Sequence, residues 1–248
     1  MKQAEAYYMQ AMDANPLKAD TYNNLGVLML KEGKGDKAME QFLLARKMDP
    51  NNTQTLFNLA EIYLAQGKTK EGLRYLEQAA DLDPDNQPAQ FKLIGYLLTL
   101  KEYDLAQNHC NALLTASPKD ADVRCDLGFV LLSYGAVDAA AGVFGQAVNL
   151  DPKMARGWYG LGLVSLKLGQ LTAAQASFKR AMALDDKNLD FLVDLALSQR
   201  AERTPAGDKA ARQTAENVQN LLDRGIGSDA QRSRAEKLVM QFKAKTAS

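Results

Sequence analysis

The chain has 248 residues, 46% of them hydrophobic and 24% charged, which is the composition of a folded protein rather than a disordered one. Its 30 basic and 30 acidic residues cancel, which argues against a general binder of nucleic acid or of anionic membranes. No stretch approaches the roughly 18 uninterrupted apolar residues that a membrane-spanning helix needs, so direct membrane insertion is not expected. Cys110 and Cys125 do not make a disulfide framework, which favours reduced thiols and a cytoplasmic location.

The prolines reveal an internal repeat. Five of the seven recur every 34 residues, at Pro16, Pro50, Pro84, Pro118 and Pro152. A strict period of this length is the signature of a repeat array, in which each copy packs only on its neighbours. Residues 1–18 are in register with the second half of a repeat. We therefore expect an upstream helix, and any leader before it, to be missing from this sequence.

Complete repeats follow in chain order, and each is predicted to be two helices joined by a turn. They span 19–52, 53–86, 87–120, 121–154 and 155–188, and a degenerate repeat begins at 189. Four of the turns carry a glycine at position 15, which fits a helix end whose closing residue needs positive φ, and Lys101 is the exception. The proline near the end of a repeat cannot continue a helix, so it marks where the second helix stops.

The period fails after Ala201. Residues 203–208 read as a loop, followed by helical stretches at about 208–223 and 229–245. Residues 200–248 hold ten Lys and Arg against six Asp and Glu, a net charge of +4. Because an open array must cover its last apolar face, we interpret residues 203–248 as a helical C-terminal cap. A small basic docking element is the alternative interpretation.

The repeated pattern resembles the tetratricopeptide repeat. Repeat 155–188 shows it in Trp158, Leu161, Gly162, Ala174, Phe178 and Ala181. Repeat 19–52 shows it in Tyr22, Leu25, Gly26, Ala38, Phe42, Ala45 and Pro50. The resemblance, over an array taken as residues 1–202, implies an all-α, right-handed superhelical solenoid of antiparallel helix pairs. Small residues at positions 8, 20 and 27 would let the helices approach closely, while large residues fill the remaining space.

Repeat 87–120 departs from this pattern. Cys110 replaces the aromatic residue at position 24, and Leu113 replaces the alanine at position 27. Volume lost at one contact is recovered near another, an exchange that protein cores tolerate well. We therefore interpret Cys110 as a core residue rather than a redox site.

Catalytic chemistry finds little support. The only histidine, His109, is adjacent to Cys110, and neighbouring residues point about 100° apart on a helix, so the two do not form a nucleophile–base pair. The sequence has no glycine-rich phosphate loop and no HExxH or CxxC motif. We expect a protein that is not an enzyme and that uses no cofactor or metal.

The resemblance implies a concave groove lined by the first helix of each repeat. Carried over position by position, it indicates the protein-binding residues Asn24, Phe57, Asn58, Phe91, Lys92, Asp126, Phe129, Tyr159 and Asp194. Asn24 and Asn58 resemble the asparagine ladder of some family members, whose amides pair with a peptide backbone, and the ladder ends at Lys92. A carboxylate clamp fits less well, because the face offers chiefly Lys92 and Arg156 as cations. The alternative is that these polar residues simply solvate an exposed surface.

The predicted groove is also divided in charge. Its C-terminal part carries Arg156 alone against Asp122, Asp126, Asp190 and Asp194. One hypothesis is that a basic stretch of the partner binds there, with apolar anchors near Phe57, Phe91 and Phe129. A second is self-association, in which the basic C-terminal tail of one copy occupies the acidic groove of another.

The sequence therefore predicts a non-enzymatic scaffold or adaptor that holds a peptide or helix of a partner protein in its concave groove. One alternative is an accessory or assembly factor of a cell-envelope secretion or pilus machine. That protein would be periplasmic or membrane-anchored if an N-terminal leader is missing. Another alternative is a targeting domain cut from a larger enzyme. The upstream sequence would separate these three classes.

Overall fold

A computed structural model describes residues 18–244, with side chains as far as Phe242. Over this range the chain forms thirteen α-helices and no strand, which confirms the predicted all-α fold. The helices are α2 (Ala19–Lys31), α3 (Gly35–Met48), α4 (Thr53–Ala65), α5 (Thr69–Leu82), α6 (Gln87–Thr99), α7 (Tyr103–Ala116), α8 (Ala121–Ser133), α9 (Val137–Leu150), α10 (Ala155–Lys167), α11 (Leu171–Leu184), α12 (Leu189–Ala201), α13 (Pro205–Asp223) and α14 (Asp229–Ala244).

Most of the predicted half repeat 1–18, including Pro16, lies outside the described residues. The described helices belong to two compact bodies that divide between residues 118 and 119. The N-terminal body holds α2 to α7 and the C-terminal body holds α8 to α14. None of these helices is both long enough and apolar enough to span a bilayer.

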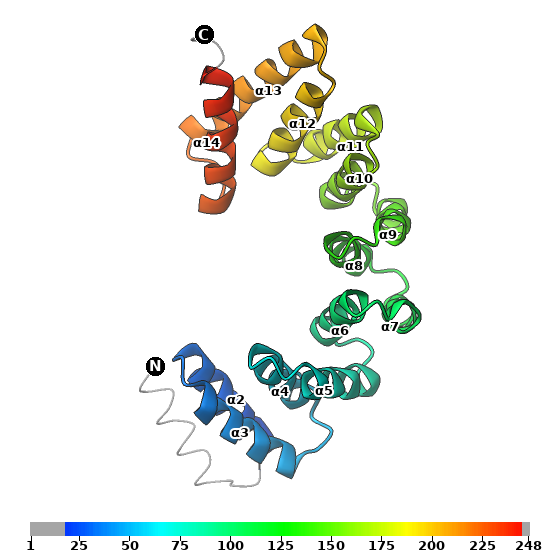
Figure 1. Ribbon diagram of the computed structural model, residues 1–248, viewed down its shortest axis with the longest axis vertical. Helices are drawn as coiled ribbons and strands as arrows, with labels where there is room; N and C mark the ends of the chain where they lie inside the picture. Colours follow the sequence, from blue (N-terminus) through cyan, green and yellow to red (C-terminus); the bar gives the residue numbers. More distant parts are fainter. Residues whose placement is uncertain (1–17, 245–248) are drawn as a thin grey trace. The chain divides into compact units, whose positions relative to one another are not determined.

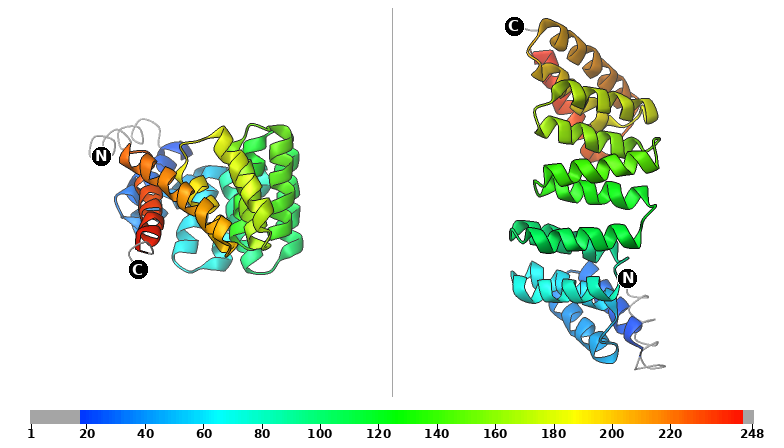
Figure 2. Two further views of the ribbon diagram at one scale, coloured as in Figure 1. Left: turned by 90° about the horizontal axis from the view of Figure 1, so that it is seen from above. Right: turned by 90° about the vertical axis from the view of Figure 1, so that its right-hand side faces the viewer.

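Within each body the helices form antiparallel pairs, α2/α3, α4/α5 and α6/α7 in one and α8/α9, α10/α11 and α12/α13 in the other (Figure 1). The pairs of the C-terminal body stack as successive layers (Figure 2). Direct contacts also join first helices of neighbouring pairs, as between α2 and α4 or between α8 and α10. The first helices of each body therefore share one face, which we call its first-helix face.

The turn inside each pair needs a residue with a left-handed backbone. φ is 74° at Gly33 and Gly67, 82° at Gly135 and 72° at Gly169, as the sequence predicted. Lys101 adopts a φ of 64° at the corresponding place. Since a Cβ makes this conformation unfavourable, Lys101 holds local backbone strain that glycine relieves in the other turns.

The second helices end where the prolines predicted. Helices α3, α5, α7 and α9 all end two residues before their proline. Helix α11 ends at the same position although Asp186 stands in place of proline. There the carboxylate of Asp185 accepts a hydrogen bond from the backbone N–H of Lys187 at 3.2 Å. Asp49 and Asp151 make the same turn, so the aspartate closes the helix even where proline is absent.

The packing inside a pair depends on a small residue facing a large one. A Cβ on the glycine at position 8 would lie within 3 Å of the phenylalanine at position 24 in three repeats, at Gly26 and Phe42, Gly128 and Phe144, and Gly162 and Phe178. All three rings are fully buried. Each ring therefore occupies the volume that the glycine leaves open.

Repeat 87–120 reverses this arrangement. Position 8 holds Ile94 and position 24 holds Cys110, and both side chains are buried together with Leu113. The exchange of volume therefore includes Ile94 as well as Cys110 and Leu113. Ile94 fills on α6 the space that an aromatic ring of the second helix fills in three other repeats. Burial raises the pKa of the Cys110 thiol from 9.0 to about 11, so the thiol stays protonated at neutral pH. Cys110 is a core residue, as predicted.

The predicted loop at 203–208 is wrong from Pro205 onward, because α13 begins there. Proline at the first helical position is compatible with a helix, and the Thr204 hydroxyl accepts a hydrogen bond from the backbone N–H of Gly207 at 2.9 Å. Helix α13 pairs with α12, and α14 contacts both (Figure 1). Ala235, Leu238 and Val239 are buried in an apolar cluster with residues of α12 and α13, so α14 covers the surface that a following repeat would cover.

The strain at Lys101 leads to a stability prediction. Replacing Lys101→Gly should raise the free energy of unfolding by about 0.5–1 kcal/mol, because glycine adopts positive φ without a Cβ clash. Urea denaturation followed by circular dichroism measures the change. The matched Lys101→Ala variant keeps a Cβ at the same φ and should show no gain, and an equal gain in both would contradict the explanation.

The core position of Cys110 leads to a second prediction. The Cys110→Ser variant should lose about 1–3 kcal/mol of unfolding free energy, since it buries a hydroxyl in place of a thiol. Partner binding should be unchanged. Thermal melts and binding measurements on the same variant check both expectations, and loss of binding at unchanged stability would refute a purely structural role.

Candidate functional site

Five predicted binding residues lie on the first helices of the N-terminal body. Asn24 on α2 is exposed, and Phe57 on α4 and Phe91 on α6 are half-buried at the same repeat position. Lys92 is also partly exposed, but Asn58 is buried. The structure therefore leaves Asn24, Phe57, Phe91 and Lys92 accessible on this face, whereas Asn58 contributes little surface.

Asn58 belongs to a buried amide network between α2 and α4. Its side-chain N–H donates to the Asn23 carbonyl oxygen at 2.9 Å, and its own carbonyl oxygen accepts from Gln54 at 3.3 Å. The Thr55 hydroxyl donates to Asn23 at 3.3 Å. Asn58 is therefore a bridge between neighbouring first helices, and Asn24 and Asn58 do not form two equivalent rungs of an open ladder. The sequence does not show that Asn23 and Asn58 face each other, so this bridge could not be predicted from it.

Lys92, the cation predicted on the N-terminal body, has an acidic partner. The Lys92 ammonium lies 3.0 Å from a carboxylate oxygen of Glu61, and both side chains are partly exposed. The pair joins α4 to α6, so part of the charge of Lys92 is already balanced within the protein. Exposed pairs of this kind contribute about 1 kcal/mol or less, so a partner carboxylate could still compete for the ammonium.

On the C-terminal body, the predicted residues Phe129 and Tyr159 are part of a continuous aromatic cluster. The Phe129 ring lies 5.0 Å from Phe144 and 6.4 Å from Tyr159, measured between centroids. Tyr159 lies 4.7 Å from Phe191 on α12 and 5.7 Å from Phe178 on α11. Both Phe129 and Tyr159 are half-buried, so one side of each supports the core while the other side is accessible.

Asp194 is not the open acidic residue that the sequence indicated. It is 5% exposed, and the Tyr159 hydroxyl donates to one of its carboxylate oxygens at 2.7 Å. Arg234 on α14 pairs with the other oxygen. Burial and the nearby charge of Asp194 raise the pKa of Tyr159, so its hydroxyl remains a donor. Asp194 instead joins three helices, α10, α12 and α14.

Two clusters on the C-terminal body each place one arginine beside two aspartates of a first helix. On α8, Asp122 and Asp126 are four residues apart, and Arg156 of α10 pairs with Asp126 and lies 3.9 Å from Asp122. On α12, Asp190 and Asp194 hold the same two repeat positions, and Arg234 pairs with both. These two arginines balance half of the predicted acidic charge. The repeat pattern predicts Arg156 on this face but not Arg234, because the 34-residue period stops before α14.

Burial distinguishes the two clusters. The side chains of Asp122 and Asp126 are 76% and 39% exposed, whereas those of Asp190 and Asp194 are 31% and 7% exposed. Gln231 of α14 also donates to Asp190 at 3.0 Å. The α8 cluster is therefore accessible to a partner, while the α12 cluster serves to hold α14 in place.

The histidine and the two cysteines are each engaged or buried in the described structure. His109 pairs with the carbonyl oxygen of the buried Gln90 at 3.2 Å. Burial raises the pKa of the Cys125 thiol to about 11. No group of three or more His, Cys, Asp or Glu side chains between residues 18 and 242 is placed to hold a metal ion.

Family models for the tetratricopeptide repeat match residues 2–53, 44–95, 63–127 and 126–188 of this chain. Together these matches span most of the sequence, and the chain belongs to the tetratricopeptide repeat family. A sequence search among curated proteins finds no match.

Similar solved structures show the same fold. A tetratricopeptide repeat protein from Parabacteroides merdae is 20% identical, with a TM-score of 0.61, over 95% of this chain and 91% of that one. YrrB, described as having an unusual peptide-binding site, is 19% identical, with a TM-score of 0.53, over 79% and 98%. PilW, a type IV pilus biogenesis factor, is 17% identical, with a TM-score of 0.60, over 82% and 92%.

The paired clusters provide a matched test of burial. Arg234→Ala should lower the unfolding free energy by about 2–3 kcal/mol, because it leaves the buried Asp194 carboxylate without its cation. Arg156→Ala removes the same kind of contact from the exposed cluster and should cost less than about 1 kcal/mol. Denaturant titrations of both variants measure the difference, and equal losses would show that burial does not govern these clusters.

Proposed function

We propose that this protein is a non-enzymatic adaptor whose first-helix faces hold a segment of a partner protein. The tetratricopeptide repeat fold, which supports a scaffold for protein–protein interaction, is consistent with this role. The observation that carries the proposal is the accessible mixture of aromatic and polar side chains on those faces. Phe57 and Phe91 occupy the same position of successive helices in one body, and Phe129 and Tyr159 adjoin each other in the other.

The first-helix faces of the two bodies would bind partner residues of different chemical character. The N-terminal face combines Phe57 and Phe91 with the exposed amide of Asn24, which offers both a donor and an acceptor to a peptide backbone. On the C-terminal face, the carboxylates open to a basic partner residue are Asp122 and Asp126. The hypothesis of a basic partner stretch beside the last three repeats is therefore limited to Asp122 and Asp126, because Asp190 and Asp194 are held by α14.

For the location we propose the cytoplasm, supported by the two free, buried cysteines, Cys110 and Cys125. An accessory role in a cell-envelope pilus or secretion machine is the second candidate, and the fold shared with PilW favours it. In that case the protein would be periplasmic or membrane-anchored.

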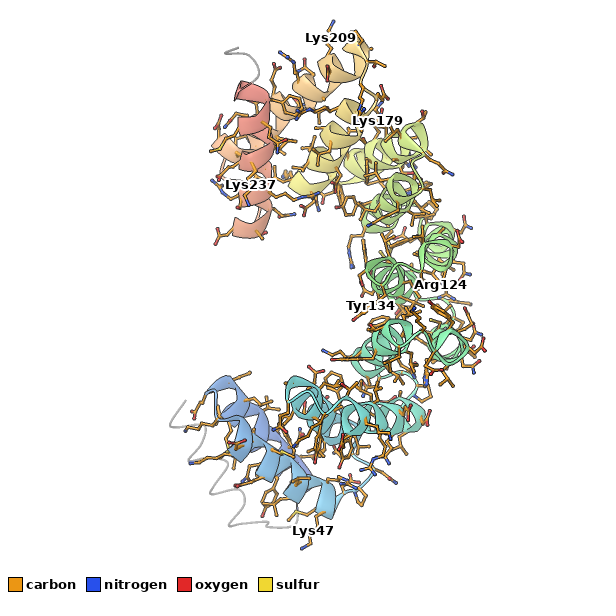
Figure 3. The ribbon with its side chains drawn as sticks, viewed as in Figure 1. Lys47, Arg124, Tyr134, Lys179, Lys209 and Lys237 are labelled. Carbon is orange, nitrogen blue, oxygen red and sulfur yellow. The ribbon has the colours of Figure 1, made fainter. Side chains whose placement is uncertain are left out.

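The scaffold proposal can be tested by affinity capture. A variant carrying Asn24→Arg, Lys92→Glu and Asp126→Lys changes accessible first-helix side chains of both bodies. The control variant, Glu71→Lys with Lys179→Glu, changes exposed residues of second helices; Lys179 lies on α11 (Figure 3). Partners of the unaltered protein should be lost from the first variant and kept by the control. Retention of the same partners by both folded variants would contradict binding through the first-helix faces.

A further inference from the structure

The side chain at position 4 of a repeat differs from one repeat to the next. On α10 the indole N–H of Trp158 donates to the Pro152 carbonyl oxygen at 3.0 Å, and the Arg180 guanidinium lies 5.9 Å from the indole ring. On α8 the same position holds Arg124, which donates to the Gln146 carbonyl oxygen at 3.3 Å. Arg180 and Gln146 both occupy position 26 of their second helices. In both repeats, a long side chain at position 4 therefore reaches position 26.

On α4 the corresponding place is an open crevice. Position 4 is Leu56 there, a shorter side chain with no polar group. A crevice of about 350 Å³ is lined by Leu56, by Pro50 in the position of Pro152, and by Gln78 at position 26. Pockets that hold ligands in proteins measure about 300–1,000 Å³, so this volume suits a single large side chain. The place that Trp158 fills on the C-terminal body is thus unfilled on the N-terminal body.

The rim of this crevice is basic. A smaller hollow of about 210 Å³ adjoins the crevice, shares Arg46 and Pro50 with it, and is also lined by Leu43 and Lys47. Lys47 extends outward from the end of α3 (Figure 3). Among the described residues, Asp81 is the one acidic side chain that lines either hollow. Two cations therefore border the crevice and its neighbour against a single carboxylate.

Arg46 is half-buried and has no acidic partner in the described part of the chain. Its Nη1 donates to the Tyr75 hydroxyl of α5 at 2.6 Å, and its guanidinium lies 5.1 Å from the centre of the Tyr75 ring. Neither Arg46 nor Lys47 forms an ion pair with another described residue. Ala80 and Val148, which hold the same repeat position 28, are apolar and buried. Since a guanidinium carries five N–H donors, Arg46 can still bind an anionic group.

We propose that the crevice at Leu56 binds a tryptophan side chain of a partner protein, flanked in its sequence by acidic residues. The indole takes the place that Trp158 takes on α10, and its N–H donates to the Pro50 carbonyl oxygen. A neighbouring carboxylate pairs with Arg46, at the rim where the protein supplies no acidic partner. The ends of α3 and α5 form this surface, so the site goes beyond the first-helix faces of the proposed adaptor function.

The blocked tripeptide acetyl-Glu-Trp-Glu-amide tests the site by NMR on the full isotope-labelled chain. Its titration should shift the backbone amide signals of Asn51, Gln78 and Leu82, which line or adjoin the crevice. A probe with leucine in place of tryptophan should bind at least about fivefold more weakly. A probe with lysines in place of the glutamates should bind about threefold to fivefold more weakly. Absence of shifts at millimolar peptide, shifts confined to other parts of the chain, or equal binding of the leucine probe would overturn the assignment.

Two variants and one control locate the contact. Leu56→Trp should fill the crevice with the chain's own indole, as Trp158 does on α10, and abolish probe binding while the helical circular dichroism signal is kept. Arg46→Gln should weaken binding about threefold to fivefold. The control Arg74→Gln should leave it unchanged, because Arg74 also lies over the Tyr75 ring, at 5.3 Å, but lines neither hollow. Unchanged binding in folded Leu56→Trp, or equal losses in the two arginine variants, would contradict the proposal.

This proposal and the adaptor function can fail separately. The variant with Asn24→Arg, Lys92→Glu and Asp126→Lys leaves the crevice unaltered, so it should bind the tryptophan probe as the unaltered chain does. If no probe binds while affinity capture still loses partners in that variant, the crevice assignment is wrong and the adaptor function stands. If the probe binds at the crevice while that variant keeps every partner, the adaptor function is contradicted and the crevice assignment stands.

Discussion

The close approach of the two helices in each pair is the constraint on which the rest of this structure depends. In three repeats it is achieved by a glycine on the first helix and a phenylalanine on the second, so near that a Cβ would collide with the ring. Ile94 and Cys110 hold the same two positions with the large side chain moved to the first helix. Since the backbone spacing is set by this pairing, the first helices of a body can align their remaining side chains on a common face.

Polar contacts between successive first helices then decide which of those side chains remain available. The Asn58 amide bridges to Asn23, and the Lys92 ammonium pairs with Glu61. Asp194 is held by Tyr159 and Arg234. Residues that look like ligand-binding groups in a repeat alignment therefore join neighbouring repeats instead. The surface left for a partner carries less unpaired charge than the sequence indicated.

Helix α14 shows how an array can end after its sequence period is lost. It contributes an apolar stripe to the cluster on α12 and α13, and it neutralises a buried aspartate with Arg234. Arg234 of the basic tail pairs with Asp190 and Asp194 of its own chain, which makes these two carboxylates less available to another copy. Self-association through the tail stays a prediction.

The sequence by itself determined the repeat length, the all-α class, the glycine turns and the proline-marked helix ends. These features depend on local backbone preferences, which neighbouring residues indicate, and on a period of 34 residues, which comparison of the repeats indicates. It also placed Cys110 in the core. Only the tertiary structure decided that Asn58 and Asp194 are buried and that Arg234 completes a second cluster. Those outcomes depend on which side chains of different helices meet, and Arg234 lies 40 residues from Asp194, outside the repeat period. The start of α13 at Pro205 is a local feature instead, set by the Thr204 cap and the proline.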